Sequence, residues 1–367
     1  MTVERLARVR ARMAEAGLDV LLLSLGADLP WLTGYEAMPL ERLTMLVLPR
    51  DGDAVLVVPR LEAPRVEEKP EVFRLRPWDE TEDPVGIVAG LIGQASGVRL
   101  AIADRAWATF LLQLQSWLPG ARWCPASVVT GPLRAVKDAA EIDALARASA
   151  AADRVAAQLV GGDIPLVGRT EAEVSADISR RLRAEGHQRV NFAIVGSGPN
   201  SASPHHEPGA RVIEQGEPIV CDFGGTLDGY CSDITRTVWT GPAGPAGEFV
   251  DLYVVLQEAQ EAGVAAASVG TPCQDVDAVP RRRIEEGGYG PFFLHRTGHG
   301  IGREEHEDPY LVHGNRDPLR AGEAFSIEPG IYLSGRYGAR IEDIVIATDD
   351  GPRPLNFVDH GLAVVDA

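Results

Sequence analysis

The sequence has no excess of positive charge and no long apolar run. Its formal net charge is −18 over 367 residues, which argues against nucleic acids and anionic membranes as partners. No stretch of about 18 apolar residues occurs, so no membrane span is predicted. The first residues contain no apolar secretory core, and no signal peptide is expected.

Cysteine is scarce, with four residues in the whole chain and no CxxC spacing. Reduced thiols in a cytoplasmic protein are the simplest interpretation. We expect Cys221 to point to the strand face opposite Asp222, and so into the core. The four residues are Cys124, Cys221, Cys231 and Cys273.

Apolar residues make up 45% of the chain, enough for a large core in a globular protein. The length predicts two domains, or at most three. Gly131 and Pro132 are the best candidate for a boundary, because both residues interrupt regular structure. We therefore expect one domain over residues 1–131 and a second over residues 132–367.

The first domain has the pattern of an α/β mixture. It contains no cluster of histidines or carboxylates with motif-like spacing, so we expect a scaffold or dimerisation domain without chemistry of its own. Helices are predicted over residues 3–17, 84–95 and 107–118, strands over 19–25 and 98–103, and a hairpin over 43–48 and 54–58.

In the second domain, helical patterns alternate with antiparallel strand patterns, which indicates an α+β fold. Helices are predicted over residues 139–159, 248–264 and 275–286, and another begins at a capping box formed by Thr170 and Glu173. Pro280 should kink or end its helix. Residues 193–198 resemble the start of a phosphate loop but lack its spacing.

One predicted hairpin carries two unusual carboxylates. Its strands, residues 220–225 and 231–237, are joined by a turn at residues 227–229. Each strand has one aspartate, Asp222 or Asp233, where a core would favour an apolar side chain. Two neighbouring carboxylates repel each other, and a divalent cation between them removes that repulsion. The hairpin therefore predicts half of a metal site.

The second half of the site can come from three residues that lie later in the sequence. His299 lies in a glycine-rich stretch, Glu328 lies between an apolar strand and a Pro-Gly turn, and Glu342 is expected inside a strand. Such a set exceeds what one zinc ion binds and suits two hard or borderline ions. The expected ligands are Asp222, Asp233, His299, Glu328 and Glu342.

The order and spacing of these residues resemble the pita-bread metallopeptidases, in particular their proline-specific branch. The resemblance covers the whole chain and is most specific from about residue 205 to residue 342. It implies a smaller creatinase-like α/β N-terminal domain, an α+β pita-bread catalytic domain and a homodimer. The motifs that carry the resemblance are Asp233-Ile234-Thr235-Arg236-Thr237, His295-Arg296-Thr297-Gly298-His299-Gly300-Ile301-Gly302, His306-Glu307 and Glu328-Pro329-Gly330.

Three more histidines match the pattern of this family by their spacing: His205, His295 and His306. The resemblance implies that they line the substrate cleft and stabilise charge on the attacked carbonyl, as a donating imidazole can. The four remaining histidines, which belong neither to the ligand set nor to these three, are expected to be ordinary core or surface residues. They are His187, His206, His313 and His360.

The resemblance also implies two divalent ions per subunit, Mn²⁺ first and Co²⁺ or Zn²⁺ as alternatives. Such ions activate a water and polarise a carbonyl. Glu328 is expected to be the general base as well as a ligand. Thr235 shares a strand face with Asp233 and could orient it, and Arg340 could pair with Glu342. Either could equally be an ordinary strand residue.

The implied substrate is a proline-containing di- or oligopeptide, and Xaa-Pro dipeptidase (prolidase) is the preferred activity. Xaa-Pro aminopeptidase (aminopeptidase P) shares every motif. Several family dipeptidases have an arginine where this chain has Tyr310, although Arg296, Arg303 or Arg336 could substitute. A creatinase-like enzyme, or a hydrolase or lyase of small osmolytes on the same fold, is a more distant alternative. A pseudo-peptidase binding module would show broken ligands, and none is broken here.

Overall fold

The computed structural model describes residues 3–93, 96–245 and 247–365. The chain divides into two compact units, residues 1–134 and 135–367. The dipeptide Gly131-Pro132 lies inside helix α5 (Ser127–Ala135) and not in a loop. None of the helices in the described part of the chain combines the length and hydropathy that a membrane span requires.

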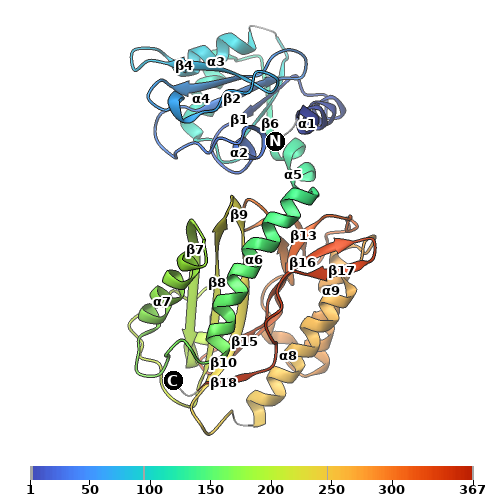
Figure 1. Cartoon of the computed structure of the whole chain (residues 1–367). Helices are drawn as coiled ribbons and strands as arrows, with labels where there is room; N and C mark the ends of the chain where they lie inside the picture. Colours follow the sequence, from blue (N-terminus) through green and yellow to red (C-terminus); the bar gives the residue numbers. More distant parts are fainter. Residues whose placement is uncertain (1–2, 94–95, 246, 366–367) are drawn as a thin grey trace. The chain divides into compact units, whose positions relative to one another are not determined.

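A mixed six-stranded sheet forms the centre of the first unit, in the order β4-β3-β2-β1-β5-β6 (Figure 1). The pairs β1–β2 and β2–β3 are antiparallel, and the other three pairs are parallel. The strands are β1 (Val20–Leu23), β2 (Met45–Pro49), β3 (Val55–Pro59), β4 (Arg74–Trp78), β5 (Arg99–Ile102) and β6 (Arg122–Pro125).

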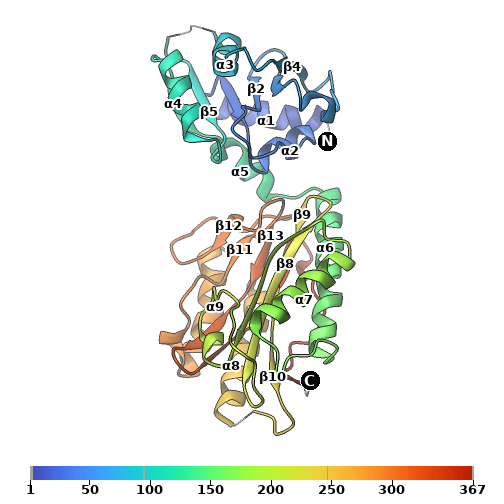
Figure 2. The same cartoon turned by 90° about the vertical axis from the view of Figure 1, so that its left-hand side faces the viewer.

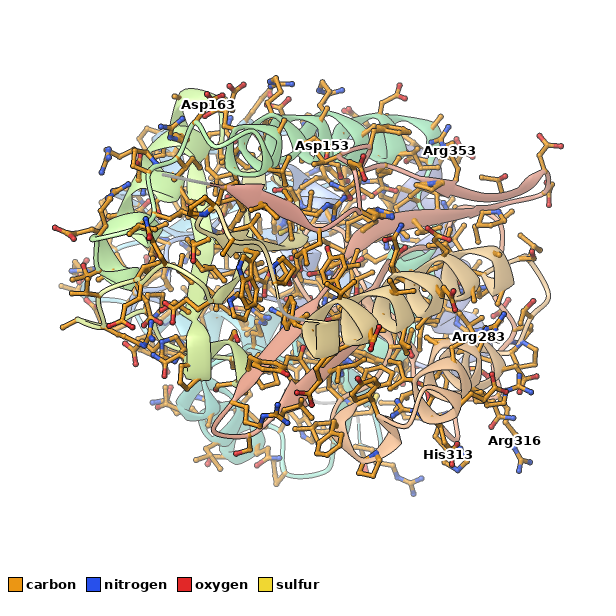
Figure 3. All side chains as sticks on the ribbon, turned by 90° about the horizontal axis from the view of Figure 1, so that it is seen from below. Asp153, Asp163, Arg283, His313, Arg316 and Arg353 are labelled. Atoms are coloured by element: carbon orange, nitrogen blue, oxygen red, sulfur yellow. The ribbon has the colours of Figure 1, made fainter. Side chains whose placement is uncertain are left out.

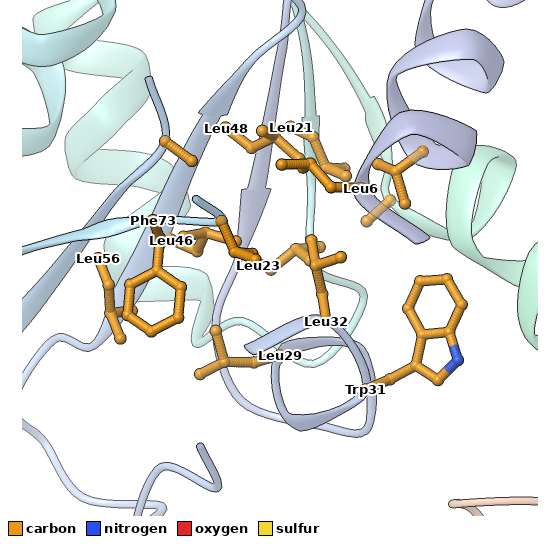
Figure 4. Close-up of a cluster of buried hydrophobic side chains, with 14 of the residues drawn as sticks. Leu6, Leu21, Leu23, Leu29, Trp31, Leu32, Leu46, Leu48, Leu56 and Phe73 are labelled. Carbon is orange, nitrogen blue, oxygen red and sulfur yellow. The ribbon is translucent and has the colours of Figure 1, made fainter. Parts of the chain in front are cut away.

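Helices cover both faces of this sheet. Leu21 and Leu23 face a core shared with Leu6 of α1 (Val3–Glu15), as Figure 4 shows, whereas Leu22 faces a second core. That second core includes side chains of α3 (Pro84–Ile92) and α4 (Ala108–Trp117). The predicted helices and strands of this region are therefore confirmed, although residues 94 and 95 lie outside the described chain. Shorter helices are α2 (Asp28–Thr33) and η1 (Ala63–Arg65).

In the second unit, strands lie between the helix pair α6–α7 and the helix pair α8–α9 (Figure 2). The predicted capping box of Thr170 and Glu173 begins α7. Pro280 was expected to kink or end its helix, and the second alternative is excluded because α9 continues through it. Its packing against α8 outweighs the missing hydrogen bond. The helices are α6 (Ala139–Val160), α7 (Glu171–Ala184), α8 (Gly247–Ala266), α9 (Cys273–Glu286), η2 (Gly198–Ala202) and η3 (Gly290–Phe292).

Two five-stranded sheets and a two-stranded hairpin carry the site. One sheet has the order β18-β10-β8-β7, with β9 paired to β8, and the other has the order β12-β11-β13-β16-β17. The strands of the first are β7 (Arg189–Ser197), β8 (Pro218–Leu227), β9 (Tyr230–Cys231), β10 (Ile234–Thr240) and β18 (Ala363–Val365). Those of the second are β11 (Gly298–Gly300), β12 (Glu307–Leu311), β13 (Ala324–Ile327), β16 (Asp343–Thr348) and β17 (Gly351–Pro354). The hairpin pairs β14 (Gly330–Leu333) with β15 (Tyr337–Arg340).

The two sheets meet at Glu342. Its backbone N–H donates to the carbonyl of Thr235 over 3.2 Å. The expectation of one strand through Glu342 was wrong, because β15 ends at Arg340 and β16 begins at Asp343. Glu342 lies where the chain passes from the hairpin to the second sheet. This passage brings its carboxylate beside the aspartate-bearing strands.

Candidate active site

A cavity of about 530 Å³ brings together every residue that the sequence singled out as a ligand or catalytic group. These residues are Asp222, Asp233, His299, Glu328, Glu342, His205, His295 and His306. The rest of its wall consists of Phe192, Ile194, Pro204, Arg296, Glu305 and Arg340.

The predicted aspartate hairpin is present. Strands β8 and β10 pair antiparallel with Asp222 opposite Thr235, and Asp233 directly precedes β10. The turn has positive φ angles at Asp228 (51°) and Gly229 (78°), as a tight hairpin turn of the primed type requires. Cys221 is buried in the apolar core, as expected for a residue on the other face of β8.

His299 lies among the carboxylates of the cavity. Its Nε2 is 3.3 Å from Oε1 of Glu328 and 3.8 Å from Oδ2 of Asp233. Candidate ligand atoms of Asp233, His299 and Glu342 all lie within 4.8 Å of one another. The Nδ1 atom is 3.1 Å from the carbonyl of Gly300, so it carries the proton and leaves the Nε2 lone pair directed at the carboxylates.

Without a cation, this cluster is electrostatically unfavourable. Burial and the nearby Glu342 raise the pKa of Asp233 well above its usual value, and burial with Glu328 does the same for Glu342. Burial also raises the pKa of Glu328 to about 7. Burial and His306 lower the pKa of His299 to about 3, so its imidazole is neutral and able to bind a metal.

Two orphaned oxygen atoms support a metal centre here. In the described part of the chain, Oδ1 of Asp222 and Oδ1 of Asp233 are buried without a hydrogen-bond partner. A buried carboxylate oxygen without a partner is costly unless a cation binds it. The donor set of four carboxylates and one imidazole suits hard or borderline divalent ions. The residues present therefore fit a divalent metal.

Arg340 is a buried cation within this cluster. Of the two possibilities that the sequence left open, a direct pair with Glu342 or an ordinary strand residue, the structure shows neither. Its Nη2 lies 2.6 Å from Oδ2 of Asp222. Its Nε donates to Oγ1 of Thr235 over 3.0 Å, and that hydroxyl donates to Oε2 of Glu342 over 2.6 Å. Arg340 thus reaches Glu342 through Thr235, which orients this carboxylate.

Tyr332 links Arg340 to His295. Its hydroxyl lies 2.9 Å from Nη1 of Arg340 and 2.9 Å from Nε2 of His295. Because an arginine can only donate, the hydroxyl oxygen accepts from Arg340 and its proton goes to His295. Nδ1 of His295, 2.8 Å from the carbonyl of Arg296, carries the ring proton. Burial lowers the pKa of His295 to about 4, which agrees with a neutral ring.

His295 lines the cavity, and its expected contact with the substrate carbonyl stays a prediction. Both of its ring nitrogens are engaged, one as donor and one as acceptor, so neither is free to donate to a substrate oxygen. The ring of His306 lies closer to the ligands, with its centroid 3.9 Å from that of His299. His306 is therefore better placed than His295 to donate into the cavity.

The remaining histidines lie elsewhere, and three of them have other partners. His187 is buried between Ser232 and the carbonyl of Leu182, and His313 is exposed (Figure 3). His360 lies 2.6 Å from Asp343, and His206 lies 2.7 Å from Glu171. Among the described residues, these four histidines do not belong to the wall of the cavity.

Sequence reasoning did not identify Tyr332 or Glu171. Tyr332 lies on β14, four residues after Glu328, in a run that reads as ordinary strand. Glu171 lies at the start of α7, where an acidic residue is expected for helix stability alone. A buried polar side chain near a site was the only signal, and burial is visible only in the folded chain.

Comparisons with known proteins agree with this site. The family model "Metallopeptidase family M24" matches residues 134–349, and "Creatinase/Prolidase N-terminal domain" matches residues 5–136. A protein named "Probable dipeptidase PepE" from Mycobacterium tuberculosis is 45% identical over 365 residues, which are 98% of this chain and 96% of that protein.

Two solved structures are similar over almost the entire chain. Dipeptidase PepE from Mycobacterium ulcerans is 45% identical with a TM-score of 0.92, over 99% of this chain and 98% of that one. A recombinant prolidase from Thermococcus sibiricus is 37% identical with a TM-score of 0.93, over 100% of both chains. The fold is thus the creatinase-type N-terminal domain followed by the pita-bread domain. The chain belongs to the metallopeptidase family M24.

Proposed function

We propose that this peptidase is an Xaa-Pro dipeptidase that uses two divalent metal ions per subunit. The observation that carries the proposal is the convergence of five candidate ligands in one cavity that also has an apolar wall and Arg296. The relatives named dipeptidase and prolidase support it. The implied substrate is a proline-containing dipeptide.

Within this proposal, the side chains divide into ligands and helpers. When bound, two divalent ions lower the pKa of a water and polarise a carbonyl. Ser326 donates to Oε1 of Glu328 over 3.1 Å and so orients it. Glu328 is the proposed general base, which would accept a proton from the water and deliver it to the leaving nitrogen. His205 and His306 are the proposed donors to the substrate carbonyl.

Arg296 is the proposed site for the carboxylate of a dipeptide. It lines the cavity, and its guanidinium lies 4.4 Å from the ring centroid of Tyr310. Arg303 lies over Tyr230, and Arg336 pairs with Glu248. Among the described residues, neither of these two arginines belongs to the cavity wall. An arginine is well suited to form a bidentate pair with a terminal carboxylate.

Xaa-Pro aminopeptidase is the second candidate, and it is favoured by Tyr310. A tyrosine at this position supplies no positive charge for a carboxylate, so Arg296 must do so alone. An activity panel separates the two candidates. It compares Xaa-Pro dipeptides, their C-terminal amides, Xaa-Pro-Yaa tripeptides and non-proline dipeptides, each with Mn²⁺, Co²⁺ or Zn²⁺ added back.

A dipeptidase should prefer Xaa-Pro over its amide and the tripeptide, whereas an aminopeptidase should prefer the tripeptide. Arg296→Met should remove the preference for a free carboxylate, while the control Arg303→Met should keep it. Full activity after exhaustive chelation would overturn the metallopeptidase mechanism and favour a creatinase-like one. Cleavage of non-proline dipeptides alone would overturn the specificity.

The remaining features of the proposal are the metal, the assembly and the compartment. Mn²⁺ is the first choice because most of the candidate ligands are carboxylates. A homodimer is expected, with residues 1–131 as its dimerisation domain, and sedimentation of the chain with and without these residues tests this. All four cysteines are free, which fits a reducing compartment such as the cytoplasm.

A further inference from the structure

Glu171 binds the segment that carries His205. This glutamate has a fully buried side chain at the start of α7 (0% exposed). Its Oε1 accepts from the backbone N–H of Ser197 (2.9 Å), from the Ser197 hydroxyl (2.7 Å) and from Nδ2 of Asn200 (3.0 Å). Its Oε2 accepts from Nε2 of His206 over 2.7 Å.

These partners all belong to one stretch, residues 197–206, and two other residues of the same stretch reach the cavity. Pro204 and His205 are part of the cavity wall. After η2 the chain passes through residues 203–210 without a helix or strand. One backbone hydrogen bond, from the N–H of His206 to the carbonyl of Ser203 (3.2 Å), closes a turn around His205. Side-chain bonds must anchor this turn to the rest of the unit if the imidazole is to be held accurately.

The same stretch also bonds to β15, the strand that carries Arg340. Nη1 of Arg340 lies 3.3 Å from the carbonyl of Pro204, and the backbone N–H of Gly338 donates to Oγ of Ser201 over 2.9 Å. His205 thus lies between an anchor on α7 and an anchor on β15. Two backbone bonds, from Glu171 N–H to the Arg211 carbonyl and from Ala172 N–H to the Gly209 carbonyl, also tie the end of this segment to α7. Loss of the Glu171 carboxylate bonds would therefore loosen the part of the wall that carries His205 without detaching the whole segment.

Glu171 is ionised in this environment. Burial opposes ionisation, but hydrogen bonds from Ser197, His206 and Asn200 outweigh it and lower the pKa of Glu171 below its usual value. A buried carboxylate that accepts this many bonds resists displacement, because each orphaned donor would lose its partner without gaining water.

We propose that Glu171 and His206 are positioning residues, which form a buried clasp that holds His205 in the substrate cleft. This inference rests on the proposed function, in which His205 contacts the substrate. The clasp has no role in metal binding, because both residues lie outside the ligand set. It also gives a role to His206, which the sequence alone presents as ordinary.

A double-mutant cycle tests the clasp. In the full-length, metal-loaded enzyme, His206→Ala should lower kcat/KM on an Xaa-Pro dipeptide by about 10- to 100-fold, a typical loss for a residue that orients an active-site group. Metal content should stay that of the parent. In a His205→Ala background, His206→Ala should cost almost nothing more, because its effect passes through His205. Partial recovery is expected for His206→Gln, whose amide can still donate to Glu171.

Glu185→Gln is the matched control. Glu185 caps the other end of α7 and pairs with the exposed Arg154. Neutralising it should change kcat/KM by less than about twofold, as for other surface pairs. Glu171→Gln should instead behave like His206→Ala, since its amide turns a donor toward His206. A loss in His206→Ala that simply adds to that of His205→Ala would overturn the clasp.

Hydrogen exchange provides a readout that needs no activity. His206→Ala should speed amide exchange in residues 197–209 and leave the rest of the second unit unchanged. Unchanged exchange there would overturn the clasp even if the enzyme were fully active. A parent enzyme that cleaves no proline peptide, but shows the expected change in exchange, would overturn the proposed substrate and leave the clasp standing.

Discussion

Nη2 of Arg340 lies 2.6 Å from Oδ2 of Asp222, and both side chains are almost fully buried. One guanidinium therefore neutralises part of a cluster that contains four carboxylates. The same side chain also bonds to Thr235 and Tyr332. With the carbonyl of Pro204, the planar guanidinium has four partners in a rigid fork geometry that the compact ammonium of a lysine does not reproduce.

Arg340→Lys should therefore weaken metal binding by about 10- to 100-fold, because Asp222 and the Thr235–Glu342 pair lose their common partner. Titration calorimetry with Mn²⁺ measures this. The control is Arg336→Lys, on the same hairpin but exposed and paired with Glu248. Equal affinities for the Arg340 variant and the parent would show that the guanidinium does not organise the ligands.

Glu328→Gln should separate proton transfer from metal binding. The amide keeps the size and one carbonyl oxygen but cannot act as a base, so kcat should fall by about 10²–10⁴. Metal analysis should still find most of the parent's ions. Asp233→Ala and Glu342→Ala provide the contrast, since each should lose at least one ion and nearly all activity. A fully active Glu328→Gln enzyme would exclude this glutamate as the base.

Metal binding should strengthen as the pH rises. Glu328, Asp233 and Glu342 all have raised pKa values without metal, so at low pH the cation must displace their protons. A carboxyl group with a raised folded pKa stabilises the fold below its unfolded pKa and loses that contribution as the pH rises through the folded value. For Glu328 this window runs from 4.5 to about 7.

The metal-free protein should thus lose stability between about pH 4.5 and pH 7, where the metal-loaded protein should not. Thermal unfolding with and without Mn²⁺ measures the effect. The rise in Tm on adding metal should be larger at about pH 8 than at about pH 5.5. A rise that is equal at both pH values would mean that the carboxylates are already ionised in the metal-free fold.

His295 and Tyr332 should behave as one unit. Tyr332→Phe removes the proton that Nε2 of His295 accepts and one partner of Arg340, and should lower kcat/KM by about 10- to 100-fold. Adding His295→Ala should cost little more. Tyr337→Phe, on the same hairpin and bonded to the exposed Arg336, is the control. Strict additivity of the Tyr332 and His295 losses would indicate that His295 acts directly on the substrate.

The sequence by itself determined most of the regular structure. Short continuous apolar runs identified strands of the first unit such as β1, and Thr170 with Glu173 identified the start of α7. It also singled out the candidate ligands, because carboxylates such as Asp222 are unusual in otherwise apolar strands. The structure brings these candidate ligands together in one cavity. Their roles in metal binding and catalysis stay predictions.

Only the tertiary structure decided which partners these side chains have. Asp222 and Arg340 are 118 positions apart in the chain, and Glu342 lies between two strands rather than inside one. Periodicity fixes which face of a strand a side chain occupies, but not which distant side chain it meets there. The partner is set by how the two sheets pack at Thr235 and Glu342, which depends on contacts from the whole second unit.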